Sequence, residues 1–547
     1  MKKSNPFSWA MRCIVLACVI LLSSCSQKTK MEAMLEQIPE NSDLVVIGNL
    51  KQIMESAGGT LENSQIKLPD YLSSMADQQE EFNTLLEKTQ IDPEVCAVMV
   101  YMYKNRAIFL FSMKDKAAFA KALEEFGYTK TGDKDDASFY IVKENEDTEY
   151  YSCVAIRGDY AYWADEIHKD SPAEAQNVLE EVIAGVKESP MSKTKAAEYI
   201  QDSNAAGMIF QVPDELLESM SGNGMPAFVR DIYSCQICMK GDLQGNKCIM
   251  NCALFDKDGN QKKATDFGLS FDTEAKIDKE ALTFIDPKEC LVAASCMKDV
   301  DWDKYFETIG SMEGIPASQK AFLAIMKSYM EKLDGTMAFG LGLEDGMQSI
   351  YDISQGLAGL DQLYLTLVFE TKEGMAQGIV NDLAGFAEQA GVQVEKKDNG
   401  VTITVPNDSK DMTFYAEIHN NFLVMSNHPI NQSSDNFSIK SVDFSNYQNA
   451  FALAFDKGDK MLTDLGIDYG LIVRGLTTAQ PYESTFTIET IDAPNTYGIV
   501  GTIANSIIQA SMNGTIEKRW SECAGDNSFA SDNDEPEDID PEMTLSE

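Results

Sequence analysis

The sequence predicts an α+β protein built from two tandem related modules, each a mostly antiparallel sheet covered by helices. Three observations predict this class. Alternating strand patterns occur in pairs joined by turn residues, which is typical of hairpins. Amphipathic helix patterns separate groups of strands instead of alternating strictly with single strands, which favours antiparallel sheets. Four pieces of the chain recur in the same order at offsets of about 250 residues.

Length and composition set the first limits on function. The chain has 547 residues, of which 44% are hydrophobic and 24% are charged, as in ordinary globular proteins. The formal net charge is −42. Such a chain repels phosphate backbones, so we expect no nucleic-acid partner and no polybasic membrane docking.

The N-terminus reads as an export signal, residues 1–24. Three basic residues precede a continuous apolar run from Cys13 to Leu22, which is too short to span a bilayer as a helix. The run ends in Leu22-Ser23-Ser24-Cys25, which resembles the lipobox of bacterial lipoproteins. The resemblance implies cleavage before Cys25 and attachment of acyl chains, palmitate among them, to that residue. Two or more chains hold a protein stably in a membrane.

The residues after Cys25 bear on the membrane to which the chain is sorted. Ser26 is not the aspartate that retains lipoproteins in the inner membrane, and no acidic run of the kind that marks surface export follows. We therefore expect an outer-membrane lipoprotein with its body in the periplasm. A cell-surface orientation is the alternative.

The body divides by its repeats into a tether (25–38), a first module (39–280) and a second module (281–520). A strand followed by a helix is predicted in residues 106–127 and again in residues 362–391. Phe111-x-x-Lys114 matches Phe369-x-x-Lys372, 258 residues later. Two unrelated modules with generic strand–helix patterns are the alternative, but the shared order favours a duplication.

Paired strands form the second repeated piece. Residues 149–165 read as a hairpin turning at Gly158-Asp159, and residues 412–427 read as one turning at Asn420-Asn421. Such residue pairs suit two-residue turns that need positive φ. The strand from Asp43 resembles that from Glu289, and the strand from Asn204 resembles that from Asn449.

Two helices have clear signals. Ser171-Pro172-Ala173-Glu174 forms a capping box with proline in the first turn. The segment Gln319–Leu333 carries a stripe of large apolar residues at helical spacing, and we expect both helices to bury their apolar stripes in the core. The C-terminal residues 521–547 are acidic without apolar periodicity, so we expect a disordered tail.

Cysteines supply the only candidate covalent cross-link. Cys235, Cys238, Cys248 and Cys252 lie in one predicted hairpin that turns at Gly245-Asn246. On a strand, residues three apart face opposite sides, so a zinc site is disfavoured. A disulfide between Cys238 and Cys252 is a second reading, since secretion reaches an oxidising compartment. Reduced, buried cysteines are the default.

Other chemical motifs are weak. Asp256–Asn260 resembles the start of a calcium loop but lacks the later glycine and glutamate, so a turn at Asp258-Gly259 is favoured. Gly340-Leu341-Gly342 lies on a strand-like run without the third glycine of a dinucleotide site. The three histidines, His168, His419 and His428, lie far apart. We predict no catalytic residue, no metal site and no cofactor.

The start of the mature chain also carries a family resemblance. Residues Ile38 to Ile53, with the opening Ile38-Pro39-Glu40-Asn41 and a strand ending in Asn49-Leu50-Lys51, resemble a family of Bacteroidetes lipoproteins known only as a domain of unknown function. The resemblance extends to about Arg519. It implies an envelope protein with a shared fold. It implies no activity, and no functional residue beyond the lipidated Cys25.

These observations together predict a lipid-anchored envelope protein that is not an enzyme. We expect it to be a binding or assembly component whose contacts are the membrane, through the lipid on Cys25, and an envelope protein or a small ligand bound between the modules. A structural scaffold for another envelope protein is the alternative. A glycan or peptide hydrolase is the less favoured one, because it needs paired carboxylates in a cleft or a nucleophile beside one of the three histidines.

Overall fold

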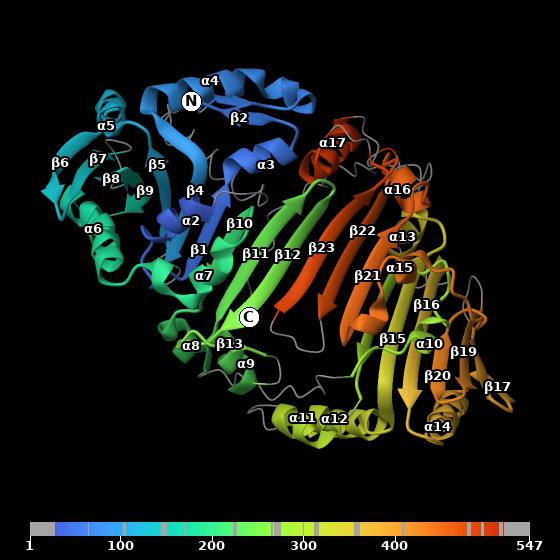
Figure 1. The fold of residues 1–547 in the computed structure, drawn as a ribbon. Coiled ribbons are helices and arrows are strands. Elements are labelled where there is room, and N and C mark those ends of the chain that lie inside the picture. Colours follow the sequence, from blue (N-terminus) through green and yellow to red (C-terminus); the bar gives the residue numbers. More distant parts are fainter. Residues whose placement is uncertain are drawn as a thin grey trace, which may run out of the picture.

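The computed structural model shows one long, mostly antiparallel sheet with helices on both faces (Figure 1). The predicted α+β class is confirmed. The structure describes residues 28–63, 65–101, 106–143, 150–168, 171–221, 227–263, 266, 275–298, 300–310, 317–354, 362–406, 411–477, 483–493, 497–512 and 518. The signal, Cys25 and the acidic tail therefore lie outside the described residues.

The first half contributes ten neighbouring strands. In sheet order they are β6 (Thr129–Lys134), β7 (Ala137–Lys143), β8 (Tyr150–Arg157), β9 (Tyr160–His168), β5 (Arg106–Met113), β4 (Ile91–Tyr101), β1 (Leu44–Asn49), β10 (Ala206–Phe210), β11 (Gln236–Gln244) and β12 (Lys247–Phe255). The short strand β13 (Gln261–Lys262) extends the end of β12, and β2 (Thr60–Glu62) and β3 (Gln65–Lys67) form a separate ribbon.

The second half repeats this order. Its strands are β17 (Gln393–Lys397), β18 (Gly400–Val405), β19 (Met412–His419), β20 (Phe422–Ser426), β16 (Leu363–Thr371), β15 (Leu333–Leu343), β14 (Leu291–Cys296), β21 (Asn449–Phe455), β22 (Gly470–Thr477) and β23 (Glu483–Ile491). Even the irregularities agree, because the register breaks early in both β4 and β15. The shared order is what the predicted duplication requires.

The two halves join through their last strands, so the sheet is continuous. β12 pairs antiparallel with β23 over residues 247–253 and 483–489 (Figure 1). Antiparallel pairing of two equivalent strands is the arrangement that a local twofold axis between them produces. The C-terminal helix α17 (Ile499–Met512) also crosses to the first half, where Gly498 and Gly501 lie against Ser56 and Ala57 next to α3 (Leu50–Ser56).

Helices flank the sheet in both halves. Those of the first half are α2 (Lys28–Leu35), α3, α4 (Ala76–Thr89), α5 (Lys116–Glu125), α6 (Pro172–Glu188), α7 (Lys195–Gln201), α8 (Asp214–Ser221) and α9 (Ala227–Tyr233), with 3₁₀ turns at Asp70–Met75 and Met191–Lys193. Those of the second are α10 (Lys279–Leu282), α11 (Trp302–Gly310), α12 (Ala317–Met330), α13 (Met347–Ser354), α14 (Ala376–Gln389), α15 (Phe437–Lys440), α16 (Lys460–Asp464) and α17, with a 3₁₀ turn at Phe444–Asn446.

Local sequence signals explain several of these boundaries. The Ser171 side chain accepts a hydrogen bond from the Glu174 amide and Pro172 opens α6, as predicted. The hairpin turns hold Gly158 at φ 57° and Asn420 at φ 56°. Glycine adopts positive φ readily, and asparagine tolerates it better than most residues, so these turns form at the predicted positions.

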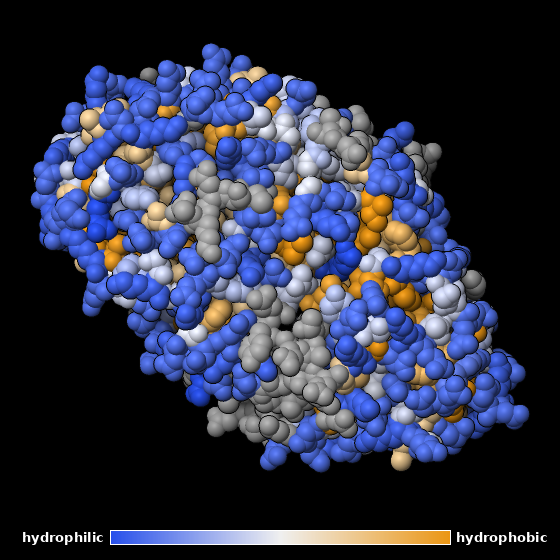
Figure 2. Space-filling model, viewed as in Figure 1, coloured by the Kyte–Doolittle hydropathy of each residue, from blue (hydrophilic) through white to orange (hydrophobic). Residues whose placement is uncertain are grey.

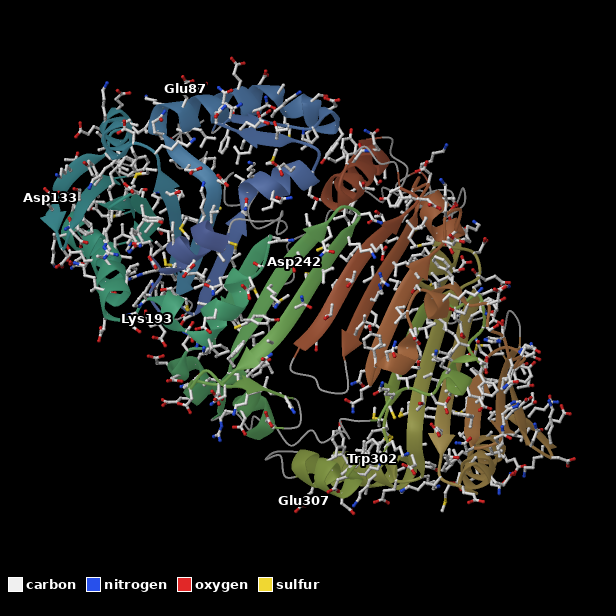
Figure 3. The ribbon with its side chains drawn as sticks, viewed as in Figure 1. Glu87, Asp133, Lys193, Asp242, Trp302 and Glu307 are labelled. Atoms are coloured by element: carbon white, nitrogen blue, oxygen red, sulfur yellow. The ribbon has the colours of Figure 1, made fainter. Side chains whose placement is uncertain are left out.

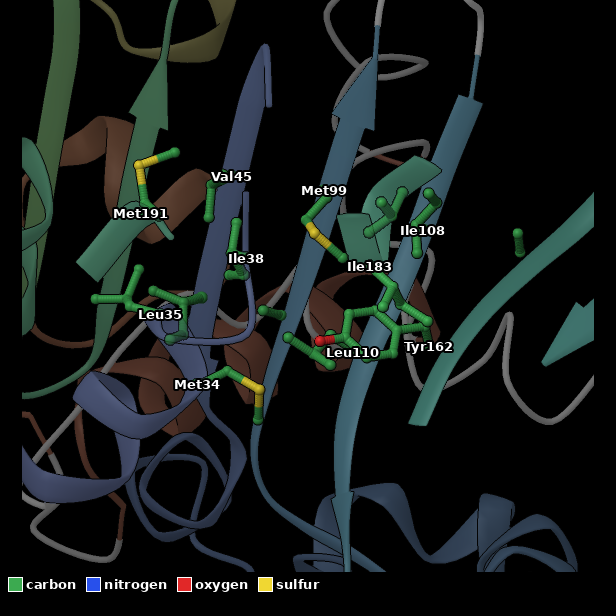
Figure 4. Packing of buried hydrophobic residues seen from close by; sticks show 14 of the residues in the cluster. Met34, Leu35, Ile38, Val45, Met99, Ile108, Leu110, Tyr162, Ile183 and Met191 are labelled. Carbon is green, nitrogen blue, oxygen red and sulfur yellow. The ribbon is translucent and has the colours of Figure 1, made fainter. Parts of the chain in front are cut away.

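Each half has one core on each face of the sheet. On one face, α2, α6 and α7 cover the first half around Met34, Val45 and Tyr162 (Figure 4). On the same face, α10 and α15 cover the second half around Phe284 and Val292. On the opposite face, α4 and α5 cover the outer strands of the first half. There α14 covers those of the second half.

The structure corrects two predicted boundaries. Residues 28–35, assigned to a tether, form α2, whose Met31 and Leu35 are buried in the first core. The boundary between the modules, placed after residue 280, falls inside α10. That helix belongs to the second half, since Ala281 and Leu282 pack in its core. Short helices supply apolar side chains to both cores here. These helices are too short for their sequences to show a periodic apolar stripe.

The predicted stripe on Gln319–Leu333 is also corrected, while that of α6 is buried as expected. On α12, Phe322 is 60% exposed and Ile325 is 56% exposed. Helix α12 pairs with α11, which begins at Trp302 (Figure 3), and Lys327 forms an ion pair with Asp303 there. The helix therefore packs mainly on a second helix, with Tyr329 near its end against the core under α14, and the side chains of Phe322 and Ile325 face outward.

Candidate functional site

The middle of the sheet has one face without charged residues, which we call the seam face. Residues directly opposite each other in an antiparallel pair project to the same face. Met250 lies opposite Gly241 on β11 and opposite Phe486 on β23, so these residues share a face. The same reading from β10 to β21 gives the members of the seam face: Ala206, Met208, Phe210, Ile237, Met239, Gly241, Leu243, Cys248, Met250, Cys252, Leu254, Ser484, Phe486, Ile488, Thr490, Leu471, Val473, Gly475, Asn449, Phe451, Leu453 and Phe455.

The opposite face of the same strands is charged. Lys247 on β12 lies opposite Glu489 on β23, and their charged groups are 3.0 Å apart. Arg474 of β22 pairs with the same carboxylate and donates to the Ser441 carbonyl oxygen at 2.9 Å. Asp242 of β11, labelled in Figure 3, accepts a hydrogen bond from the Asn204 amide. Charge at the centre of the sheet is thus confined to one side.

The seam face is partly exposed although it is apolar. Met239, Met250, Phe451 and Phe486 are all partly exposed. None of them belongs to the four packed cores, which lie on the other face or on the outer strands. The visible surface in Figure 2 is mainly hydrophilic, with hydrophobic residues in separate groups. The seam face, by contrast, is a row of partly exposed apolar side chains shared by neighbouring paired strands, and an exposed apolar patch of that kind marks an interaction site.

Small residues shape this face. The ring of Phe451 lies over Gly475, where an added Cβ would come within 2.1 Å of it. A Cβ on Gly241 would meet only the Ala206 carbonyl oxygen, at 3.8 Å. There is therefore open space above Gly241, next to Met250. One row of paired positions in the second half is polar, since Ser295 lies opposite Asn449 and Ser484 lies in the same row two strands further on.

The Cys238–Cys252 disulfide, which was the second reading beside reduced cysteines, is not formed in the structure. Both cysteines are free thiols. The register places Cys238 opposite Ala253 and Cys252 opposite Met239, so the two side chains project from opposite faces of the sheet. Thiols whose Cβ atoms point apart cannot be bridged without moving the backbone. Burial raises the pKa of both thiols, which keeps them protonated and unreactive.

Cys25, the predicted lipidation site, lies outside the described residues, as does Cys523. In the described ranges, no helix combines the length and apolarity needed to cross a membrane.

His428 belongs to a buried polar cluster that the sequence did not predict. Its Nε2 atom lies 3.4 Å from Oε1 of Glu289 and 3.2 Å from Oγ1 of Thr366. The Glu289 side chain is fully buried, and its other oxygen accepts a hydrogen bond from the Asp286 amide at 2.8 Å. Burial lowers the pKa of His428, but the hydrogen bond and the charge of Glu289 outweigh it, and the net pKa is raised.

Two glycines make room for this carboxylate. A Cβ on Gly340 would come within 2.1 Å of the Glu289 carboxylate, and one on Gly342 would come as close to the Lys288 carbonyl oxygen. The Gly340-Leu341-Gly342 motif thus serves close packing of the segment before β14 on the strand β15. This glycine pair is the sequence signal that could have pointed to the cluster, but it was weighed only as a dinucleotide site.

The cluster lacks the geometry of a catalytic relay. A hydrolytic triad needs the hydroxyl on one ring nitrogen and the carboxylate on the other. Here Thr366 and Glu289 both face Nε2, while Nδ1 lies 3.3 Å from the Pro429 carbonyl oxygen. Thr366 is also fully buried. The arrangement stabilises a charged imidazole inside the protein and offers a substrate no exposed nucleophile.

The other histidines lie apart from this cluster. The His168 ring contacts Tyr150 with centroids 5.1 Å apart. His419 is the last residue of β19 and flanks the Asn420-Asn421 turn; it is only partly exposed, and its ring lies 5.0 Å from that of Phe284.

The Asp256–Asn260 segment forms a turn and not an ion site. Asp256 accepts hydrogen bonds from the amides of Asp258 and Asn260 and pairs with Lys262 at 2.7 Å. The bond to Lys262 is the main reason that the pKa of Asp256 is lowered to about 2. Over the part of the chain that the structure describes, no three His, Cys, Asp or Glu residues gather as a metal would need.

Comparisons with known proteins add little. No family model and no curated protein matches the chain. Among solved structures, crystal form III of TP0453 is 8% identical with a TM-score of 0.23, covering 43% of this chain and 83% of that chain. Crystal form I is 10% identical with a TM-score of 0.22, covering 43% and 82%. TM-scores this low carry no argument about fold or function.

Proposed function

We propose that this chain is a lipid-anchored envelope protein that works by binding, without catalysis, through the seam face. The lipid on Cys25 holds it in the outer membrane with its body facing the periplasm. The observation that carries the proposal is the contiguous, uncharged and partly exposed apolar surface shared by both halves. Neither half could form this surface alone, because it continues across the β12–β23 pair.

Apolar surface left in water is costly, which supports an occupant. Burying it contributes roughly 25 cal/mol per Å². The chain has 87 acidic residues, so a sheet face that is exposed to solvent is expected to carry several charges. The seam face spans six neighbouring strands and carries none. The charged groups of the same strands lie on the opposite side.

Site-specific photo-crosslinking in intact cells tests the proposal. A benzoylphenylalanine in place of Met250 would project from the seam face, and one in place of Ile249 would project from the opposite face of the same strand. We expect a reproducible adduct with another molecule from position 250 and none from 249. Equal adducts from both positions, or none from 250, would reject binding at the seam face.

The anchor is tested separately. Cys25→Ala removes the acylated thiol, so we expect the protein to leave the membrane fraction while a variant changed at Cys523 stays there. Unchanged membrane retention of Cys25→Ala would reject lipidation as the anchor.

A scaffold for another envelope protein is the second candidate, and α12 favours it. Phe322, Ile325 and Met326 lie on one side of the helix and are 60%, 56% and 39% exposed. The double variant Phe322→Ser/Ile325→Ser should unfold like the unmodified chain, because these side chains are already solvated. Loss of a protein crosslink in that variant would support the scaffold, and retention of all crosslinks would reject it.

A further inference from the structure

We infer that the occupant of the seam face is the acyl chain of a membrane lipid. This inference rests on the proposed function and names its ligand class. The surface offers dispersion contacts and space, without the charges that a nucleotide, a sugar acid or a charged peptide needs.

The backbone of the seam strands is closed to a peptide. β12 is paired on one side with β11 and on the other with β23, and β22 is paired with β21 and β23. A peptide that adds to a sheet needs a free edge with unpaired amides and carbonyls. An occupant of this face can therefore contact side chains only, which suits a ligand that itself has no hydrogen-bonding groups along its length.

The face is wide enough to hold an acyl chain lying across the strands. The six strands from β10 to β21 are about 4.8 Å apart, which makes the face about 24 Å wide. The acyl chains of one leaflet occupy about 15 Å, half of a hydrocarbon core of about 30 Å. A chain lying across the strands would cover the row from Gly241 through Met250 to Phe486.

The residues of the seam face are suited to a ligand without a fixed shape. Met208, Met239 and Met250 have flexible, polarisable side chains that adapt to different apolar partners. The open space above Gly241 admits methylene groups close to the backbone. The row that holds Ser295, Asn449 and Ser484 lies beside the apolar rows and offers hydroxyl and amide groups to an ester at the end of the chain.

Two measurements on the full lipidated chain test the inference. In the first, the protein is purified, extracted with organic solvent and the extract analysed by mass spectrometry. Covalently attached acyl chains stay with the protein, so we expect the extract to contain stoichiometric lipid with long acyl chains. In the second, titration with dansyl-undecanoic acid should show saturable binding that added phospholipid displaces.

Three variants locate the site. Met250→Lys places a charge on the face and Gly241→Leu fills the open space, and we expect each to weaken binding of the probe at least tenfold. Ile249→Lys makes the matched change on the opposite face, next to Asp242, and should leave binding unchanged. Circular dichroism and thermal unfolding of each variant separate a lost site from a lost fold.

The outcomes distinguish the inference from the proposed function. A protein adduct at position 250, with no lipid in the extract and no probe binding, would overturn the inference and leave the binding function standing. No adduct, no lipid and no probe binding would overturn both. Probe binding that Ile249→Lys weakens as much as Met250→Lys would place the lipid elsewhere and overturn the inference.

Discussion

The rings of Phe451 and Phe486 lie 6.2 Å apart between centroids, although a whole strand separates β21 from β23. They meet because Gly475, on the strand between them, is paired with both and has no side chain. Two large apolar groups thereby cover one backbone position of the seam face. This contact makes the second half of that face a continuous surface instead of a row of separate side chains.

Gly475→Ala should therefore destabilise the protein. The added Cβ would lie within 2.1 Å of the Phe451 ring, which would have to move. We expect a loss of roughly 1–3 kcal/mol in the free energy of unfolding, measured by urea denaturation. Gly378→Ala on α14 is the control. Its Cβ meets nothing within 4 Å, and alanine favours a helix, so stability should be unchanged or higher. Equal stability of both variants would contradict the close contact.

The ion pairs behind the seam should contribute more than those at the surface. Glu489 is held by Lys247 and Arg474, and its side chain is 15% exposed. Glu489→Ala leaves two cations without their carboxylate, and we expect a loss of roughly 1–3 kcal/mol. Glu198→Ala breaks the exposed pair with Lys195 and should cost less than about 0.5 kcal/mol. Thermal unfolding of both variants measures the two stability losses. A larger loss for Glu198→Ala than for Glu489→Ala would contradict the prediction.

The His428 cluster predicts a pH dependence of stability. The neighbouring Glu289 and Asp286 carboxylates and the Pro429 carbonyl raise the pKa of His428 above 6.5 despite burial. The folded state then holds the proton more tightly than the unfolded state, so protonation stabilises the fold. The contribution is complete below about pH 6.5 and is lost as the pH rises through the raised pKa.

Comparison with His428→Gln measures this effect. The difference in unfolding free energy between the two proteins should shrink as the pH rises from 6 to 9. An NMR titration of the imidazole should give a pKa above that of a free histidine. A pKa below 6.5 would contradict the ion pair with Glu289.

The cysteines should behave as buried thiols. Burial raises the pKa of Cys153 to about 12 and raises that of Cys238 as well. The thiolate is the reactive form, so we expect slow alkylation of both in the native protein at pH 8 and fast alkylation after unfolding. Both should react in urea without any reductant. Protection of Cys238 and Cys252 that only a reductant removes would show that they form a bridge after all.

Much of the fold was predictable because it follows from local patterns. Strand alternation, the hairpin turns at Gly158 and Asn420 and the capping box at Ser171 each depend on a few neighbouring residues. The structure reproduces them. The stripe on α12 failed because its periodicity shows which side of the helix is apolar, but not whether another element covers that side.

The candidate site was not predictable in the same way. The pattern of β12, with Cys248, Met250 and Cys252 alternating with Ile249 and Asn251, shows which residues share a face. It does not show that β12 pairs with β23, more than 200 residues later. The Glu289–His428 pair joins residues 139 apart, and its one local signal was the glycine pair on β15.

The sequence by itself determined the class of the protein: alternation, turn residues and repeated spacing specify an α+β chain with two similar halves. Its first residues predict a lipid anchor at Cys25. Tertiary structure alone decided that the halves share one sheet, that Cys238 and Cys252 face opposite ways, and that an uncharged face continues across both halves. The physical reason is the distance along the chain between the residues that interact. Turns and helices are set by neighbours in the chain, whereas register and burial depend on strands that meet only when the whole chain has folded.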